Sequence, residues 1–156
     1  MLEATTIQTR NLLSNVDLHT AASSQAKNHG ARNAVDGLQG TSWRFEPGDE
    51  RPSLFIQLSK PQRADTLSLS QAAAAREHLG KLARILRINV YVNRSSKPME
   101  VTLDPDELEP TMIPLGRSLR IKRIRIEVLA TAPGSNKVQR GGFAEVVLLH
   151  EKEKRR

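Results

Sequence analysis

The chain has 156 residues, the size of one domain with a single core, and its 38% hydrophobic and 26% charged residues are typical of a globular protein. It contains no cysteine, which excludes disulfides and thiolate metal sites, and no apolar run near the roughly 20 residues of a membrane-spanning helix. Aromatic residues make up only 3% of the chain, so Leu, Ile, Val and Ala must form most of the core.

We expect a single domain from residue 10 to residue 150. Residues 1–9 are then an N-terminal extension without the apolar stretch of a signal peptide, and residues 151–156, EKEKRR, are a charged tail. These ends are compatible with a cytoplasmic protein and equally with one domain of a longer extracellular or periplasmic protein, the interpretation that we favour. The absence of cysteine favours a bacterial source or a reducing compartment.

Short apolar runs of period two predict strands along most of the chain. Residues 31–35 predict one helical turn. Residues 53–58 predict a strand bounded by Pro52 and Pro61, and residues 65–70 predict the next strand, with Leu67 and Leu69 on one face. Residues 72–82 are rich in alanine but lie between two strands, so we expect a long loop with at most one turn of helix.

The clearest predicted strand covers residues 86–92, where Leu86, Ile88, Val90 and Val92 point to one face. Residues 99–103 and 111–115 are shorter candidates, and residues 143–149 form the last one. Residues 119–121 and 124–128 alternate in opposite phases, which predicts a β-bulge near Lys122. Seven or eight short strands without a long amphipathic helix indicate an all-β fold, an antiparallel β-sandwich or barrel.

Several motifs follow one another in the order of a known family. They are Ala22-Ser23-Ser24, Asn33-Ala34-Val35-Asp36-Gly37, Thr41-Ser42-Trp43, a strand over residues 52–58, and Ala144-Glu145. In this order, over roughly residues 10 to 150, the chain resembles the discoidin, or coagulation-factor type C, family. The resemblance implies a galactose-binding-like jelly roll that holds ligands on loops at one end. It also implies that Trp43 is a core residue rather than a sugar platform.

The same resemblance implies a structural calcium ion at the Asp-Gly turn. The matching side chains are Asp36, Thr41 and Glu145, with backbone carbonyls near Asn33 and Leu38, and Ca²⁺ takes about six to eight such oxygen ligands. The chain departs from the family at Leu38, where Asp or Asn is usual, and this reduces the local acidity. The alternative is that Asp36 and Glu145 only cap turns by accepting hydrogen bonds from backbone amides.

Mapped onto this chain, the ligand loops of the family are residues 25–30, 44–51 and 72–81. They supply the paired donors and acceptors that sugar hydroxyls need, and Phe45 is their one aromatic residue. Phe45 alternatively anchors the loop from below, and residues 76–78 alternatively form a solvated turn. The loops carry no apolar tips for docking on a membrane. The candidate ligand-binding residues are Asn28, His29, Arg44, Phe45, Glu46, Arg76, Glu77 and His78.

Motifs of enzyme active sites are absent from the sequence. The four histidines do not occur at metal-ligand spacing, and there is neither a Gly-x-Ser-x-Gly elbow nor a phosphate-binding glycine loop. The acidic pairs lie in polar, turn-like segments, where carboxylates are solvated. We therefore expect no enzyme activity.

These observations predict a non-catalytic carbohydrate-binding module, a monomeric unit within a larger protein. The alternative is a protein–protein interaction or scaffold domain that packs on a neighbouring domain, which the scarcity of aromatic residues favours. The formal net charge of +7 allows a third hypothesis, binding of nucleic acid or another acidic polymer, although no aromatics interleave with the basic residues. Its candidates are Arg117, Arg120, Lys122, Arg123 and Arg125.

Overall fold

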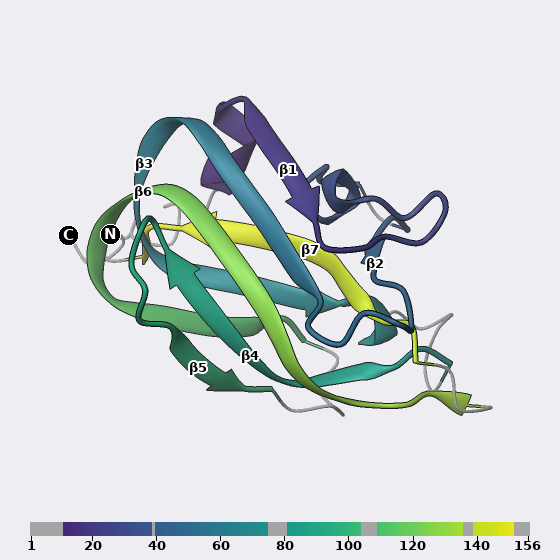
Figure 1. Cartoon of the computed structure of the whole chain (residues 1–156). Helices are drawn as coiled ribbons and strands as arrows, with labels where there is room; N and C mark the ends of the chain where they lie inside the picture. The colour runs from purple at the N-terminus through teal and green to yellow at the C-terminus, as the bar shows by residue number, and fades with distance from the viewer. Residues whose placement is uncertain (1–10, 39, 75–80, 104–108, 136–138, 152–156) are drawn as a thin grey trace, which may run out of the picture.

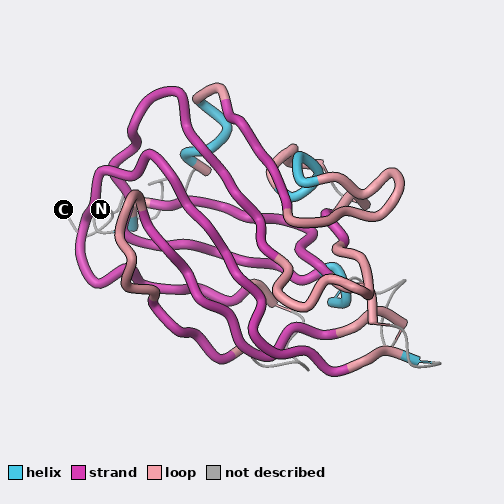
Figure 2. Tube along the Cα trace, viewed as in Figure 1, coloured by secondary structure: helices cyan, strands magenta, loops and turns pink. Residues whose placement is uncertain are grey.

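The computed structural model describes residues 11–38, 40–74, 81–103, 109–135 and 139–151. Most of this part of the chain is in strands (Figure 2). The elements are η2 Leu12–Asn15, β1 Leu18–Ala22, η3 Ala31–Ala34, β2 Trp43–Arg44, β3 Ser53–Gln71, η4 Ala72–Ala74, β4 Arg84–Val92, β5 Met99–Thr102, β6 Thr111–Ala132 and β7 Gly142–Leu149. None of the helices described is long and apolar enough to cross a membrane. The predicted extension at residues 1–9, and the tail beyond residue 151, lie outside the described residues.

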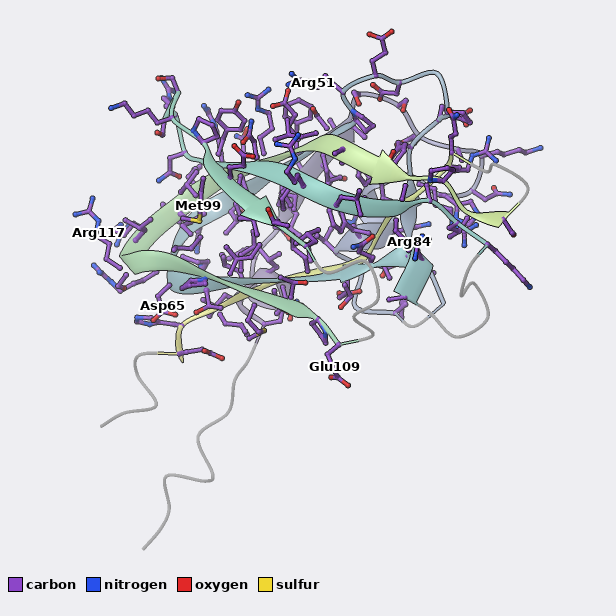
Figure 3. The ribbon with its side chains drawn as sticks, turned by 90° about the horizontal axis from the view of Figure 1, so that it is seen from below. Arg51, Asp65, Arg84, Met99, Glu109 and Arg117 are labelled. Carbon is purple, nitrogen blue, oxygen red and sulfur yellow. The ribbon has the colours of Figure 1, made fainter. Side chains whose placement is uncertain are left out.

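The strands form two antiparallel layers that share their longest members, β3 and β6 (Figure 1). In the first layer, the first half of β3 pairs with β1 and with the second half of β6, followed by β4 and β5. In the second layer, the other halves of β3 and β6 pair together, and β7 and β2 continue the sheet. Figure 3 shows one layer above the other, with Arg51 at the first and Asp65 at the second. The predicted antiparallel β-sandwich is confirmed.

Both long strands bend where they pass between the layers. Gln57 of β3 lies opposite Arg123 and Gln62 lies opposite Ile121, so Lys122 alone spans the stretch that four β3 residues occupy. The predicted irregularity near Lys122 is therefore present. It arises because the inner side of the bend is shorter than the outer side.

Pro61 lies within this bend and does not end the strand, contrary to prediction. It is exposed and has no partner in the β3–β6 register. A proline is tolerated there because no ladder hydrogen bond needs its missing N–H. Residues 53–58 and 65–70, predicted as separate strands, are thus two halves of β3.

The core fills the space between the layers and consists mainly of Leu, Ile, Val and Ala, as predicted. Trp43 is fully buried, and its ring stacks on Phe143 with the centroids 6.1 Å apart. Its predicted role as a core residue is confirmed. The alanine-rich segment contributes buried Ala72 and Ala73 in the single turn η4, and residues 75–80 lie outside the described residues.

The connections at one end of the sandwich form a surface that we call the rim. It comprises the described parts of residues 23–30, 45–52, 72–83 and 133–141, because β3 starts and ends there and β4 and β7 start there. In Figure 1 the rim lies on the side opposite the bend of β3 and β6. The predicted ligand loops 25–30 and 44–51 therefore meet at this end, together with the described ends of loop 72–81, residues 72–74 and 81.

Candidate functional site

Two rim loops are joined through the carboxylate of Asp49. It accepts hydrogen bonds from the hydroxyls of Ser23 and Ser24, the latter at 2.7 Å. The two hydroxyl oxygens in turn accept from backbone amides, Ser23 Oγ from Ser53 N at 2.8 Å and Ser24 Oγ from Glu46 N at 3.0 Å. Because both hydroxyls are used as donors and acceptors, residues 45–52 are fixed against residues 23–30.

Strand β2 places Arg44 beside the loop that carries Asn28 and His29. The backbone amide of Arg44 donates to His29 O at 3.1 Å, and Ala26 N donates to Arg44 O at 2.7 Å. Asn28 closes the turn in the left-handed conformation, at φ 66°, which asparagine tolerates better than most residues. These three candidates of the predicted site therefore lie together.

Charged side chains collect around Arg44. Arg140 Nη2 donates to Glu46 Oε1 at 2.8 Å. Burial, followed by the positive charge of Arg140, lowers the pKa of Arg44 from its ordinary value. The Arg140 and Glu46 side chains are 41% and 46% exposed, so their ion pair contributes little to stability and can exchange its hydrogen bonds for those of a ligand. This cluster places cationic donors beside a carboxylate acceptor. A sugar hydroxyl can accept a hydrogen bond from the guanidinium groups and donate one to the carboxylate.

Among the remaining predicted residues, the structure describes Phe45, which does not contribute to this polar cluster. Phe45 is 3% exposed and packs against Trp43 with the ring centroids 5.7 Å apart, so its ring anchors the loop and offers no stacking face. Buried aromatic area is worth more in the core than on a solvated loop, which explains this position. The triplet Arg76, Glu77 and His78 lies outside the described residues.

Sequence reasoning missed two residues of the rim, Asp49 and Arg140. Asp49 stood in a selected loop but looked like one of several solvated acids. Arg140 follows a segment rich in Pro, Gly and Ser that connects β6 to β7. In an antiparallel sandwich that connection ends at the same rim as the β2–β3 connection, and this was the signal that could have identified it.

A hollow of about 320 Å³ is lined by chain neighbours of the cluster, Phe45, Pro47 and Gln139, and not by the three charged residues themselves. The rest of its lining comes from the loop with Asp49 and Glu50 and from the end of β6 at residues 128–131. This volume is at the lower end of the range of about 300–1,000 Å³ that is usual for small-molecule sites. The rim therefore combines a polar cluster with a shallow recess.

The predicted metal residues meet at the turn that follows η3. Thr41 Oγ1 lies 2.9 and 2.8 Å from the two carboxylate oxygens of Asp36, 3.2 Å from Leu38 O and 3.4 Å from Asn33 O. A hydroxyl has one proton to donate, so four acceptor oxygens around it exceed what it can satisfy. Leu38 N also donates to Asp36 Oδ1 at 3.0 Å, which is the turn-capping role of the alternative interpretation.

Glu145 of β7 adds a second carboxylate to this set. Burial, and then the negative charge of Asp36, raise the pKa of Glu145 to about 7, while a hydrogen bond from the Gly37 amide acts in the opposite direction. Two carboxylates, a hydroxyl and two carbonyls are hard oxygen donors that fit Ca²⁺. The described residues hold no group of three or more His, Cys, Asp or Glu that suits a metal, so any site here depends on the hydroxyl and the carbonyls.

Comparisons with known proteins support the fold. The family 32 carbohydrate-binding module of Clostridium perfringens NanJ, solved with galactose, matches with a TM-score of 0.70 at 18% identity over 91% of this chain and 98% of that one. An F5/8 type C domain of Bacteroides fragilis matches with a TM-score of 0.64 at 17% identity, over 85% of this chain and 91% of the other. A chitosan-binding module of Paenibacillus sp. IK-5 matches with a TM-score of 0.63 at 18% identity, over 89% and 98%. No protein-family model and no curated protein matches the sequence.

Proposed function

We propose that this domain, which has the fold of these modules, is a non-catalytic carbohydrate-binding module that holds a neutral, galactose-like sugar at the rim. The observation that carries the proposal is the cluster of Arg44, Glu46 and Arg140 beside the recess. A sugar hydroxyl donates one hydrogen bond and accepts others, so a carboxylate paired with one guanidinium group, with a second guanidinium group nearby, can bind vicinal hydroxyls.

The predicted complex is weak. Phe45 is buried, so the described rim supplies hydrogen bonds without an aromatic platform, and each hydrogen bond to sugar replaces one to water. Weak binding by one module suits a protein in which the module keeps a larger, extracellular or periplasmic chain close to a glycan. That location, and a bacterial source, belong to the same proposal.

Chemical-shift titration with galactose tests this function. Galactose should shift the backbone amides of residues 25–30, 44–46 and 139–141, and Arg140→Gln should weaken the binding about tenfold because a charge-assisted donor is lost. The matched control is Arg87→Gln, which removes an arginine of similar exposure from the Arg87–Glu100 ion pair on β4 and β5. Absence of rim shifts with galactose and with other simple sugars would overturn the proposal in favour of a scaffold domain.

We further propose that Asp36, Thr41 and Glu145 hold a structural Ca²⁺ together with the carbonyl groups of Asn33 and Leu38. The support is the excess of acceptor oxygens around Thr41 and the mutual repulsion of the two carboxylates. A divalent cation removes both unfavourable features and joins the turn to β7. Its role is to stabilise the fold beside the rim.

Thermal unfolding at pH 7.5 with calcium and with a chelator tests the metal proposal. Binding to the folded state alone raises stability by about 2.7 kcal/mol at a hundredfold excess over Kd, which raises the melting temperature by several degrees. Asp36→Asn should abolish this difference, while Asp17→Asn, at an exposed carboxylate before β1, should retain it. Equal melting temperatures of the unmodified protein in both conditions would contradict the site.

A further inference from the structure

A second hollow, which we call the face groove, lies on the outer side of the first layer and has a volume of about 350 Å³. It crosses β1, β3, β6 and β4, and the register explains its lining. Ala21 lies opposite Phe55, Phe55 opposite Arg125, and Arg125 opposite Tyr91, so these outward side chains form one row across four strands. A parallel row closer to the bend contains His19, Gln57 and Arg123.

The aromatic residues of the chain divide between the core and this groove. Trp43, Phe45 and Phe143 pack together in the core. The other two aromatic residues, Phe55 and Tyr91, both line the face groove, and Phe55 is 40% exposed. A phenylalanine ring on the solvent side of a sheet forgoes the free energy of burial, so its presence beside a tyrosine suggests a surface that becomes covered.

The face groove is cationic. Its lining includes Arg94, Arg123 and Arg125 and no carboxylate. None of these three forms an ion pair with any residue that the structure describes. The neighbouring acid on this face, Glu127, is bound to Arg51 at 3.2 Å, which Figure 3 shows on the outer side of the first layer.

Arg125 is held in place by Tyr91. Its guanidinium carbon lies 3.9 Å from the centroid of the tyrosine ring. Stacking uses the face of the guanidinium and leaves the N–H groups at its edge free to donate to an anion, for which a carboxylate has the matching fork geometry. Beside it, Gln57 and His19 form no side-chain hydrogen bond with a described residue and are available to hydroxyl groups.

We propose that the face groove binds an acidic polysaccharide, with the carboxylate of a uronic acid residue on Arg123 and Arg125 and the apolar face of a sugar ring on Phe55. The row that contains Glu127 and Asn89 separates this site from the rim. A nucleic acid strand fits less well, because its repeated phosphates need a longer basic track than a groove that ends at Glu127. The site thus adds a charged ligand class to the neutral sugar proposed for the rim.

Calorimetric titration with tetragalacturonate and with its methyl ester isolates the carboxylate, since both probes share one sugar backbone. The acid should bind about tenfold more tightly than the ester, and added salt should weaken it. Arg125→Gln should reduce the affinity for the acid about tenfold, and Phe55→Ser should reduce the affinity for both probes. Arg63→Gln, an exposed arginine on the second layer, is the matched control and should bind as the unmodified protein does.

Equal affinity for acid and ester, or equal effects of Arg125→Gln and Arg63→Gln, would overturn the proposal. Tighter binding of an oligouridylate than of tetragalacturonate would replace it with a nucleic acid site. Thermal melting of each variant separates loss of binding from loss of folding. Phe55→Ser should remain folded, because the Phe55 ring is already partly exposed. The galactose titration of the rim is a separate readout, so either proposal can fail alone.

Discussion

At the scale of single residues, Gly142 marks the closest approach of two strands beside the rim. A Cβ atom there would overlap the carbonyl oxygen of Trp43 on β2. Gly142→Ala should therefore destabilise the domain by about 2 kcal/mol or more, because one of two paired strands has to move. Gly48→Ala is the control, since a Cβ at Gly48 meets nothing within 4 Å. Urea unfolding measures both, and equal midpoints for the two variants would contradict the argument.

Glu145 should make the stability of the metal-free protein depend on pH, and its pKa shift determines the direction of that dependence. Burial and Asp36 raise the pKa of Glu145 to about 7 in the folded state, against an ordinary value of 4.5. Between these values the folded state keeps a proton that the unfolded state has released, so stability in chelator should fall as the pH rises from about 4.5 to 7.

The variant Glu145→Gln isolates this effect, because histidines also titrate in the same range. In chelator, the difference in unfolding free energy between the variant and the unmodified protein should increase in favour of the variant from pH 5 to pH 7. Urea unfolding at several pH values gives this difference. A difference that is constant over the range would show that Glu145 titrates normally.

At the scale of elements, Asn93 fixes the irregular stretch where β6 changes layer. Its side-chain oxygen accepts from the amides of Lys122 and Arg123 at 2.7 and 3.2 Å, and its Nδ2 donates to Arg120 O at 2.9 Å. It also has φ 57°, a left-handed conformation that alanine adopts at a cost.

Substitutions at Asn93 should separate these two roles. Asn93→Gly removes the side-chain hydrogen bonds but suits the backbone, whereas Asn93→Ala loses both features and should be less stable than Asn93→Gly by about 1 kcal/mol. Both should be less stable than the unmodified protein. Chemical denaturation ranks the stabilities of the three proteins. An alanine variant as stable as the glycine variant would show that the left-handed conformation at residue 93 carries no cost for alanine.

The sequence predicts elements well where burial alternates strictly. Residues 86–92 lie within β4, with Ile88 and Val90 buried as predicted. The start of β4 was predicted incorrectly because register shifts near Arg87 bury Ile85 instead of Leu86. Both residues are apolar, so the alternation does not show at which of them the phase changes. The halves of β3 were predicted separately because a proline usually ends a strand, and only tertiary pairing shows that it sits in a bend.

The candidate metal site and the rim differ from the face groove in how far the sequence alone predicts them. Motif order predicted that Asp36, Thr41 and Glu145 lie close together and identified two of the rim loops, since each motif lies in one contiguous segment. The face groove is assembled from side chains on four strands, and Ala21 and Arg125 of one row lie far apart in the sequence. No local pattern links such residues, so the third hypothesis grouped Arg123 and Arg125 with neighbours such as Arg117, which lines a different hollow.

At the scale of the whole molecule, the rim and the face groove occupy different surfaces of one continuous sheet framework. The row with Glu127 and Asn89 lies between them, held by Arg51 and by cross-strand hydrogen bonds. Coupling between two ligands requires a conformational equilibrium that both of them bias, whereas these sites are joined by continuously hydrogen-bonded strands. Galactose and tetragalacturonate should therefore bind independently. Saturation with one should leave the Kd of the other unchanged within twofold in calorimetry. Competition between them would instead place both ligands in a single site and refute the assignment of the face groove.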